Sequence, residues 1–360
     1  MDSSASVSLD FEATDLQYSP FYQSIVCVGT FDYGNWVHTG SLWLCHVDKE
    51  RDEQKPSITS LATVDNGTGV QALTWSEHYV NSIMTANYDW SISFWNANKA
   101  EKVLSCAAHS APVRDVDWNT HIHDYVLTAS DSSRIKLWDL INLEHVVSQF
   151  AEHTKAVNAV RWNNNNQEQF ASSSDDGLVK IWDRRSADAS VTTLFDRESG
   201  SAMLCCDWHK SDDWLLAVGS ANRHIYIWDT RNPLMPVMRR EAHRGAVRSV
   251  RFDTTHPSRL LTGAEDGVTR AWSIHEGIFL THEHRLHAGA VTAVDWTVHD
   301  SALMTSCGSG ADASLVSVPL QAVQQVREVE RDGRLVTMKL PLGDVSAAAA
   351  PTQTDVIVDG

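Results

Sequence analysis

The feature that most constrains the fold is a tryptophan that recurs along the chain at a nearly constant interval. Its positions, separated by 43, 44, 46 and 44 residues, are Trp95, Trp138, Trp182, Trp228 and Trp272. A second aromatic position lies 20 residues earlier in each unit and occurs once more beyond them, at Trp75, Trp118, Trp162, Trp208, Phe252 and Trp296. Ten of the fourteen tryptophans therefore occupy two positions of one repeat. A repeat of roughly 40–45 residues is typical of β-propeller blades.

Within each unit, apolar and polar residues alternate as they do in short β-strands. In one unit the alternating segments are 111–118, 125–130, 135–138 and 146–150. Polar turns separate these segments, which are rich in β-branched and aromatic residues. Four strands make a propeller blade, which buries its two faces against its neighbours. The sequence therefore predicts an all-β fold of stacked blades.

Six units are clear, and a seventh is expected from the N-terminal part of the chain. There Tyr18 occupies the first aromatic position and Trp43 lies near the second. We predict a seven-bladed propeller over residues 1–320, with blade 1 at about 7–62 and the six clear repeats at 63–320.

Closing the ring requires one outer strand from a chain end. Residues 6–11 are the leading candidate for this strand. The alternative lies in the C-terminal extension, 321–360, where the segments on either side of Asp332 and Gly333 are predicted to form a hairpin. The last part, 346–360, is predicted to be a disordered tail.

A second group of polar residues recurs at fixed distances from the repeated tryptophan. Two units carry the full set of His, Ser or Thr, Asp and Trp, namely His153, Ser172, Asp176, Trp182 and His243, Thr262, Asp266, Trp272. Their donors and acceptors can form one buried network that fixes a turn. This composition resembles the structural tetrad of the WD-repeat family. Because the sets recur from unit to unit, we predict a structural role and not catalytic triads.

Composition limits the classes of partner and compartment. The formal net charge of −17 disfavours a nucleic-acid partner. No run approaches 18 apolar residues, so we expect no direct membrane insertion. The first 20 residues lack a basic start and an apolar block, so no secretory signal is expected. The six cysteines show no CxxC spacing, which fits a reducing compartment such as the cytoplasm.

No motif for an enzyme, a cofactor or a metal site stands out. The sequence contains no GxGxxG, phosphate loop or GxSxG. Histidine-rich patches occur at His121, His123, His282, His284 and His287, and we expect them on solvated inter-strand loops, with His287 as the repeat histidine. The adjacent Cys205 and Cys206 are expected to face opposite sides of a strand as buried small residues. We therefore predict a binding protein and not an enzyme.

Several short motifs, taken in order, resemble a family of import receptors. They are YSPF in the first blade, TWSE in the second, CDW in the fifth and the connection WDTRNPLMPV after it. Together they resemble the receptors for the type 2 peroxisomal targeting signal, the peroxin-7 family. The resemblance covers roughly Leu16 to Leu320, and the C-terminal tail lies outside it.

The resemblance implies a role in protein import. Such receptors bind, in the cytoplasm, an N-terminal targeting signal that starts with Arg and ends with His-Leu or similar, and that lies as an amphipathic helix on one propeller face. A co-receptor, either a separate protein or a long form of the type 1 signal receptor, covers the helix. The complex then meets docking proteins and cycles to the peroxisome or to a glycosome-like organelle.

Candidate contact residues lie just before the turn position and just after the first Val of each unit, and Trp90, directly after the turn residue Asp89, is added as an apolar contact. They are Tyr88, Trp90, Arg114, Asp131, Asn158, Asp175, Arg248 and Glu265, together with Gln71. Among them Asp131, Asp175 and Glu265 are predicted to bind the arginine of the signal, with Tyr88 and Trp90 as apolar contacts.

The chain also departs from the family, which can place an acidic residue three positions after the repeat histidine. Here Gly69, Pro112, Ala156, Ala202, Ala246 and Ala290 occupy those positions. The acidic contact must therefore come from elsewhere. Arg231 and Asn232 are expected to hold the connection after the fifth blade or to touch the co-receptor.

A different function is indicated by a repeated W-D-x-R pattern at 182–185 and 228–231. This pattern in adjacent blades is typical of substrate receptors of cullin-4 ubiquitin ligases, whose arginines face the adaptor. A general WD-repeat scaffold without cargo is the third possibility. Partner identification separates the three, because import predicts a bound type 2 signal, the ligase role predicts the adaptor, and a general scaffold is expected if neither is found.

Overall fold

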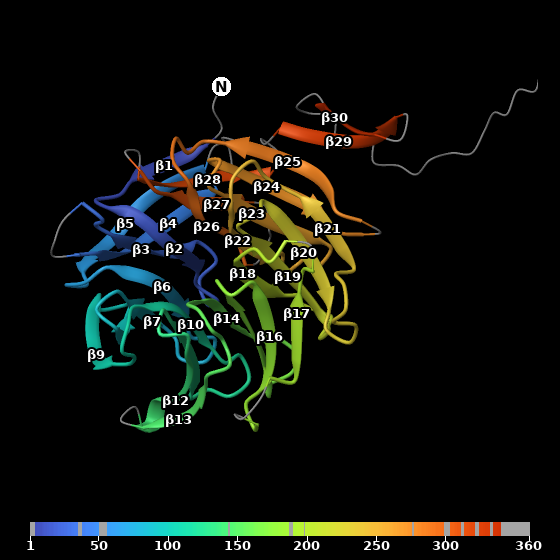
Figure 1. Cartoon of the computed structure of the whole chain (residues 1–360). Coiled ribbons are helices and arrows are strands. Elements are labelled where there is room, and N and C mark those ends of the chain that lie inside the picture. The colour runs from blue at the N-terminus through green and yellow to red at the C-terminus, as the bar shows by residue number, and fades with distance from the viewer. Residues whose placement is uncertain are drawn as a thin grey trace, which may run out of the picture.

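The computed structural model consists of seven antiparallel β-sheets arranged in a ring (Figure 1). It describes residues 4–34, 38–49, 56–142, 145–186, 190–197, 199–275, 277–298, 303–310, 313–320, 324–331 and 334–339. The innermost strand of each sheet packs against the innermost strand of the next, and the last packs against the first. Within the described ranges, no helix has the length and apolar character needed to cross a membrane.

Each blade runs from an inner strand at the central channel to an outer strand at the rim. The inner strands are β2 (Glu12–Tyr18), β6 (Val70–Trp75), β10 (Val113–Trp118), β14 (Val157–Trp162), β18 (Met203–Trp208), β22 (Val247–Phe252) and β26 (Val291–Trp296). The second strands are β3 (Ile25–Phe31), β7 (Ser82–Asn87), β11 (Tyr125–Ser130), β15 (Gln169–Ser174), β19 (Leu215–Ser220), β23 (Arg259–Ala264) and β27 (Leu303–Gly308).

The third and outer strands complete the blades, which we number 1 to 7 in the order of their inner strands. The third strands are β4 (Ser41–Lys49), β8 (Ser91–Asn96), β12 (Ile135–Asp139), β16 (Leu178–Asp183), β20 (His224–Asp229), β24 (Val268–Ser273) and β28 (Ser314–Pro319). The outer strands are β5 (Pro56–Asp65), β9 (Glu101–Ala107), β13 (Val146–Phe150), β17 (Thr192–Phe195), β21 (Met238–Glu241), β25 (Phe279–Arg285) and, for blade 7, β1 (Ala5–Ser8). A 3-10 turn, η1 (Leu140–Asn142), follows β12.

The two ends of the propeller meet in blade 7. β1 pairs antiparallel with β28, with Ala5 opposite Ser317 and Ser8 opposite Ser314. The strand therefore begins one residue before the predicted segment 6–11 and ends at Ser8, after which the chain crosses to β2. This pairing removes an exposed edge from the last blade and ties the two ends together.

The C-terminal hairpin does not close the ring, so the alternative closure by this hairpin is wrong. Its strands are β29 (Gln324–Arg331) and β30 (Arg334–Lys339), which pair with each other. β29 also pairs with β25, which extends the sheet of blade 6 to six strands. In Figure 1 the hairpin projects from the rim beside β25. The predicted disordered tail, 346–360, lies outside the described residues.

The repeated aromatic at the end of each inner strand joins neighbouring blades. The indole nitrogen of Trp75 donates to the carbonyl of Gln17 at 3.0 Å, and that of Trp208 donates to the carbonyl of Arg161 at 3.0 Å. Both indoles are buried. The aromatic ring at this position therefore fills the wedge between two blades. The donors of Trp75 and Trp208 bond across the interface, whereas that of Trp118 bonds to the carbonyl of His123 in its own blade.

A belt of carboxylates, buried at Asp15 and Asp207 and half-buried at Asp117 and Asp295, also links the inner strands, and no pattern in the sequence indicated it. Each accepts a backbone N–H from the next blade: Asp15 from Leu73 at 2.9 Å, Asp117 from Trp162 at 2.6 Å, Asp207 from Phe252 at 2.8 Å and Asp295 from Tyr18 at 2.9 Å. Burial outweighs the nearby arginines and raises the pKa of Asp15 to about 6 and that of Asp117 to about 7.

Blade 1 departs from the repeat at its second aromatic position. Trp43 is only partly buried, and its indole nitrogen donates to Asp10 at 2.8 Å and to the hydroxyl of Ser41, on its own strand, at 3.2 Å. Cys45 instead lies opposite Val26, as Trp95 lies opposite Ile83 in blade 2. This substitution explains why the first repeat is weak in the sequence.

Candidate functional site

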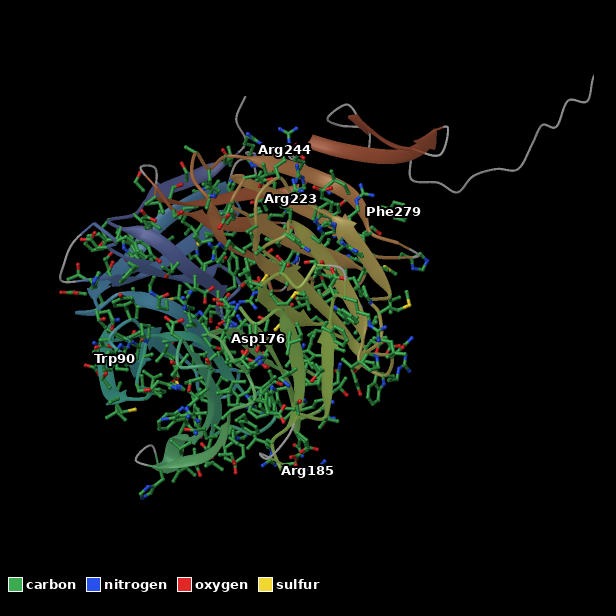
Figure 2. All side chains as sticks on the ribbon, viewed as in Figure 1. Trp90, Asp176, Arg185, Arg223, Arg244 and Phe279 are labelled. Carbon is green, nitrogen blue, oxygen red and sulfur yellow. The ribbon has the colours of Figure 1, made fainter. Side chains whose placement is uncertain are left out.

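The two complete sets of repeat residues form hydrogen-bonded networks. In blade 4, Nδ1 of His153 bonds to Asp176 at 2.8 Å and Nε2 bonds to the hydroxyl of Ser172 at 2.8 Å. The indole nitrogen of Trp182 donates to the same hydroxyl at 2.8 Å. Asp176, labelled in Figure 2, also accepts the backbone N–H of Thr154 and so fixes the turn.

Blade 6 repeats this geometry with a threonine. His243 bonds to Asp266 at 3.1 Å and to the hydroxyl of Thr262 at 2.7 Å, and Trp272 donates to that hydroxyl at 2.9 Å. Burial opposes ionisation of Asp266, but hydrogen bonds from His243 and the backbone outweigh it and lower the pKa to about 2. Because Thr262 is buried on every side, the network has no access for a substrate and stabilises the turn.

Blade 3 carries the same network without its acid. His109 bonds to Thr128 at 2.7 Å, and Trp138 donates to Thr128 at 2.9 Å. Ser132 stands where the other two blades have Asp, and Nδ1 of His109 has no partner among the described residues. Burial and the nearby Lys136 lower the pKa of His109 to about 3. The histidine is therefore neutral and the turn is held by fewer contacts.

The mouth of the central channel brings most of the predicted contact residues together. A cavity of about 400 Å³ lies there. Its lining includes Gln71, Arg114, Asn158, Arg248 and Glu265, which come from blades 2, 3, 4 and 6. The residue just after the first Val of each unit therefore faces the channel, because it lies at the start of the inner strand.

The predicted residues pair with one another inside their own blades. Arg114 forms an ion pair with Asp131 at 2.5 Å, and Arg248 forms one with Glu265 at 2.5 Å. In both cases an arginine of the blade already balances the acid.

Blade 4 makes the corresponding contact without a positive charge. Asn158 donates to Asp175 at 2.7 Å and to the carbonyl of Met203 at 3.0 Å. A neutral amide cannot balance a carboxylate. Asp175 is therefore the only one of the three predicted acids whose described partner is uncharged.

The two predicted apolar contacts lie in different places. Tyr88 packs on Phe31 and His38, with ring centroids 5.0 and 4.7 Å away. Trp90 is 49% exposed and lies at the margin of the molecule, far from Asp176 in the view of Figure 2. Its carbonyl accepts the backbone N–H groups of Ala108 and His109. The structure therefore does not bring Trp90 to the channel mouth.

The histidine-rich patches are only partly in loops. His121 and His123 lie between β10 and β11, where the ring of His123 packs on His78 at 3.9 Å. His282 and His284 lie within β25, so their expected placement on an inter-strand loop is wrong. The register of β24 and β25 places them opposite Ala271 and Thr269. No group of three or more potential metal ligands occurs in the described part of the chain.

The adjacent cysteines face opposite sides of β18. Cys205 packs in a cluster with Ile225 and Val250, whereas Cys206 packs with Trp208 and Val218. Burial raises the pKa of the Cys205 thiol to about 12. This thiol is therefore protonated and unsuited to nucleophilic attack.

The arginines of the two W-D-x-R segments share one geometry. Arg185 forms an ion pair with Asp183, with Nη2 and Oδ2 2.5 Å apart, and Arg231 forms one with Asp229, with the same atoms 2.7 Å apart. Their side chains are 67% and 58% exposed. Arg231 also lies over the ring of Trp214 at 5.6 Å, so it holds the connection after β20. Figure 2 shows Arg185 at the margin opposite Arg244.

Two residues at the channel mouth were missed because blade 1 lacks the repeat spacing. Glu12 begins β2, and Tyr33 follows β3. Both line the cavity at the mouth. Counting back from Tyr18 instead of from a tryptophan would have placed Glu12 on the inner strand.

Two family descriptions match the chain. That of the nucleolar protein 10-like, N-terminal domain covers residues 141–319. That of the WD domain, G-beta repeat covers residues 100–139. With the seven sheets, these matches show an all-β, seven-bladed β-propeller with a WD40 repeat.

The chain is also similar to parts of larger proteins. It is 24% identical over 306 residues to Protein transport protein SEC31 of Coccidioides immitis (strain RS), covering 81% of this chain and 20% of that protein. It is 27% identical over 284 residues to E3 ubiquitin-protein ligase COP1 of Arabidopsis thaliana, covering 79% of this chain and 32% of that protein. The chain thus spans a fifth to a third of these relatives.

A shorter similarity connects the chain to a peroxisomal protein. The chain is 28% identical over 131 residues to Peroxisome biogenesis protein 7 of Arabidopsis thaliana. The match covers 36% of this chain and 40% of that protein.

Proposed function

We propose that this propeller is an import receptor for proteins that carry a type 2 peroxisomal targeting signal. In this proposal it binds the signal in the cytoplasm and, with a co-receptor, delivers the cargo to the peroxisome or a glycosome-like organelle. The short match to Peroxisome biogenesis protein 7 and the ordered motifs of blades 1, 2 and 5 support it. The role is binding, without catalysis.

The observation that carries the proposal is Asp175, which does not itself line the cavity at the channel mouth but bonds to Asn158, which does, and has no cationic partner among the described residues. Asp131 and Glu265 each have an arginine partner, which an incoming arginine would have to displace. Asp175 is held only by the amide of Asn158 and so offers a charge-assisted acceptor without that competition. The arginine of the signal is therefore expected at Asp175, with the other two acids at its sides.

A short signal helix needs more than one contact to bind stably. A helix of about ten residues is marginal in water, so it orders only on the surface that binds it. Tyr88, packed on Phe31, offers an aromatic surface beside the mouth. A co-receptor that covers the exposed side of the helix would add the buried area that one short helix cannot supply.

A pull-down with a labelled signal peptide and the co-receptor tests this proposal. Asp175→Lys should reduce capture at least tenfold, and reversal of Asp131, Asp175 and Glu265 together should abolish it. Asp48→Lys is the matched control, because this exposed residue lies near the end of β4, away from the mouth. Unchanged capture by a folded triple variant would contradict the proposal.

The alternative is a substrate receptor of a cullin-4 ubiquitin ligase, and one observation favours it. Arg185 and Arg231 are exposed and held in the same fork by the Asp of the W-D pair. The similarity to E3 ubiquitin-protein ligase COP1 points in the same direction. A general scaffold is expected if neither partner set is found.

Affinity purification of the full chain distinguishes the functions. Import predicts matrix enzymes with the targeting signal and docking proteins, whereas the ligase role predicts the adaptor. Arg185→Ala together with Arg231→Ala should remove the adaptor and leave cargo unaffected. Loss of cargo upon Asp175→Lys, with no change from the arginine variants, would favour import.

A further inference from the structure

A second cavity lies on the seam where blades 7 and 1 meet. Its volume is about 810 Å³. It is lined by β1, by the crossing from β1 to β2, by residues 31–34 after β3, and by the turn before β28. We call this cavity the seam groove. It exists because the chain leaves the rim at β1 and crosses to the inner strand β2 without filling the space above the seam.

The seam groove adjoins the cavity at the channel mouth. Glu12 and Tyr33 line both cavities. The two cavities differ in charge, because arginines from several blades line the mouth.

All charged residues among the described lining of the seam groove are acidic. Asp10, Glu12 and Asp32 line it, and no Lys, Arg or His does. Asp10 accepts hydrogen bonds from Trp43 and Ser41 and so belongs to the fold of blade 1.

The other two acids of the groove are less engaged. Asp32 accepts only the backbone N–H of Gly34, at 2.9 Å. Glu12 is half-buried, and its carboxylate has no hydrogen-bond or ion-pair partner among the described residues. Two carboxylates therefore remain for a cation from outside.

Aromatic and apolar side chains complete the groove. Tyr33 is 57% exposed and packs edge-on against Phe31, with ring centroids 4.1 Å apart. Leu9, Phe11 and Leu286 also line the cavity. An aromatic ring beside carboxylates is a favourable site for Arg or Lys, since the ring face attracts a cation while the ring covers its methylene groups.

We propose that the seam groove docks an extended segment of a partner protein in which lysine or arginine residues alternate with apolar residues. Glu12 and Asp32 bind the cations, and the exposed ring of Tyr33, which packs on the buried ring of Phe31, contacts the apolar side chains. The net charge of −17 speeds the approach of such a segment. This inference goes beyond the signal-binding role, because its residues and its ligand segment are different.

Fluorescence anisotropy with a defined probe tests the proposal on the full chain. The probe is a labelled nine-residue peptide of alternating Arg and Leu, and its counterpart has Glu in place of Arg. We expect the Arg peptide to bind and the Glu peptide not to bind. Glu12→Lys with Asp32→Lys should weaken binding of the Arg peptide at least tenfold.

A matched pair of charge reversals distinguishes binding in the groove from attraction by the overall negative charge of the protein. Asp48→Lys with Glu101→Lys changes the net charge equally, at exposed sites that do not line the groove. This pair should change the affinity less than twofold. Equal weakening by the two pairs, no effect of the groove pair, or no binding of the Arg peptide would each overturn the proposal.

Two further variants keep the test decisive. If the groove reversals unfold the chain, Glu12→Gln with Asp32→Asn preserves size and should still weaken binding at least threefold. Asp175→Lys, which should reduce capture of the signal peptide at least tenfold, should leave binding of the Arg–Leu probe unchanged. The two proposals can therefore fail independently.

Discussion

Blade 4 and blade 7 are both four-stranded, but they are held in different ways. Blade 4 is continuous in sequence and contains the complete network of His153, Ser172, Asp176 and Trp182. Blade 7 has Val316 at the position of Trp182, and its outer strand β1 comes from the other end of the chain. One blade is stabilised by local side chains and the other by pairing across the whole chain length.

The difference between the two blades indicates where binding surfaces can form in a repeat protein. A complete network fixes a turn and leaves no buried polar group free to bind a ligand. At the seam, the crossing from β1 to β2 replaces the repeated turn and leaves a groove. Regular repeats therefore mark the scaffold, whereas the departures mark candidate sites.

Among the changes that test this comparison, removal of β1 should have the largest effect on stability. Deletion of residues 1–8 exposes the edge of β28 and removes four pairs of backbone partners. At about 1 kcal/mol per hydrogen bond, we expect a loss of roughly 4 kcal/mol in the free energy of unfolding. Urea denaturation measures it. A synthetic peptide of residues 1–11, added in trans, should restore most of the loss; an unchanged midpoint would show that the seam does not depend on β1.

Breaking the network of blade 4 should have the next largest effect. His153→Ala removes two hydrogen bonds and leaves Asp176 buried without its main partner, so we expect a loss of about 3 kcal/mol. The matched variant His109→Ala in blade 3 leaves no buried carboxylate without its partner, and should lower the free energy of unfolding by about 1–2 kcal/mol. Thermal unfolding of the two variants should rank them in this order. Equal losses would mean that the acid contributes nothing.

The sequence predicted the scaffold well because the repeat encodes it locally. The offsets of His153, Ser172 and Asp176 from Trp182 place four side chains that the structure joins directly. Long-range features were harder to predict. The acceptor role of Asp117 toward Trp162 depends on which blade is its neighbour, and the pairing of Arg114 with Asp131 depends on side-chain direction at a turn. The position of Glu12 was missed because blade 1 has Cys45 where blades 2 to 6 have tryptophan.

The carboxylate belt of the inner strands allows a test of a smaller effect on stability, one that depends on pH. The pKa of Asp117 is raised from 3.8 to about 7, so the unfolded chain loses this proton at lower pH than the folded chain does. Stability should therefore fall as the pH rises from about 4 to about 7. Asp117→Asn keeps an acceptor for the N–H of Trp162 and cannot ionise. The full shift corresponds to roughly 4 kcal/mol at pH 8. We expect a gain well below this value, because Asp117 is only half-buried, and nearly no gain at pH 4, by urea denaturation at both pH values. A variant that loses stability equally at both pH values would show that the amide does not replace the contacts of the carboxyl group and that its ionisation has no effect on stability.

The smallest effect should come from completing a network that is incomplete. Ser132→Asp places a carboxylate where Asp176 stands in blade 4, within the turn beside Nδ1 of His109, which has no partner among the described residues. The new acid should raise the pKa of His109 from about 3 and add about 1 kcal/mol of stability, offset in part by its own desolvation. Ser132→Asn, which offers a similar shape without the charge, is the control. If the Asp variant gains more than the Asn variant, the network stabilises through an ionised acid. If both lose stability, the nearby Lys136 and the existing bonds of Thr128 already fix this turn, and blade 3 is held as blade 7 is, without a complete network.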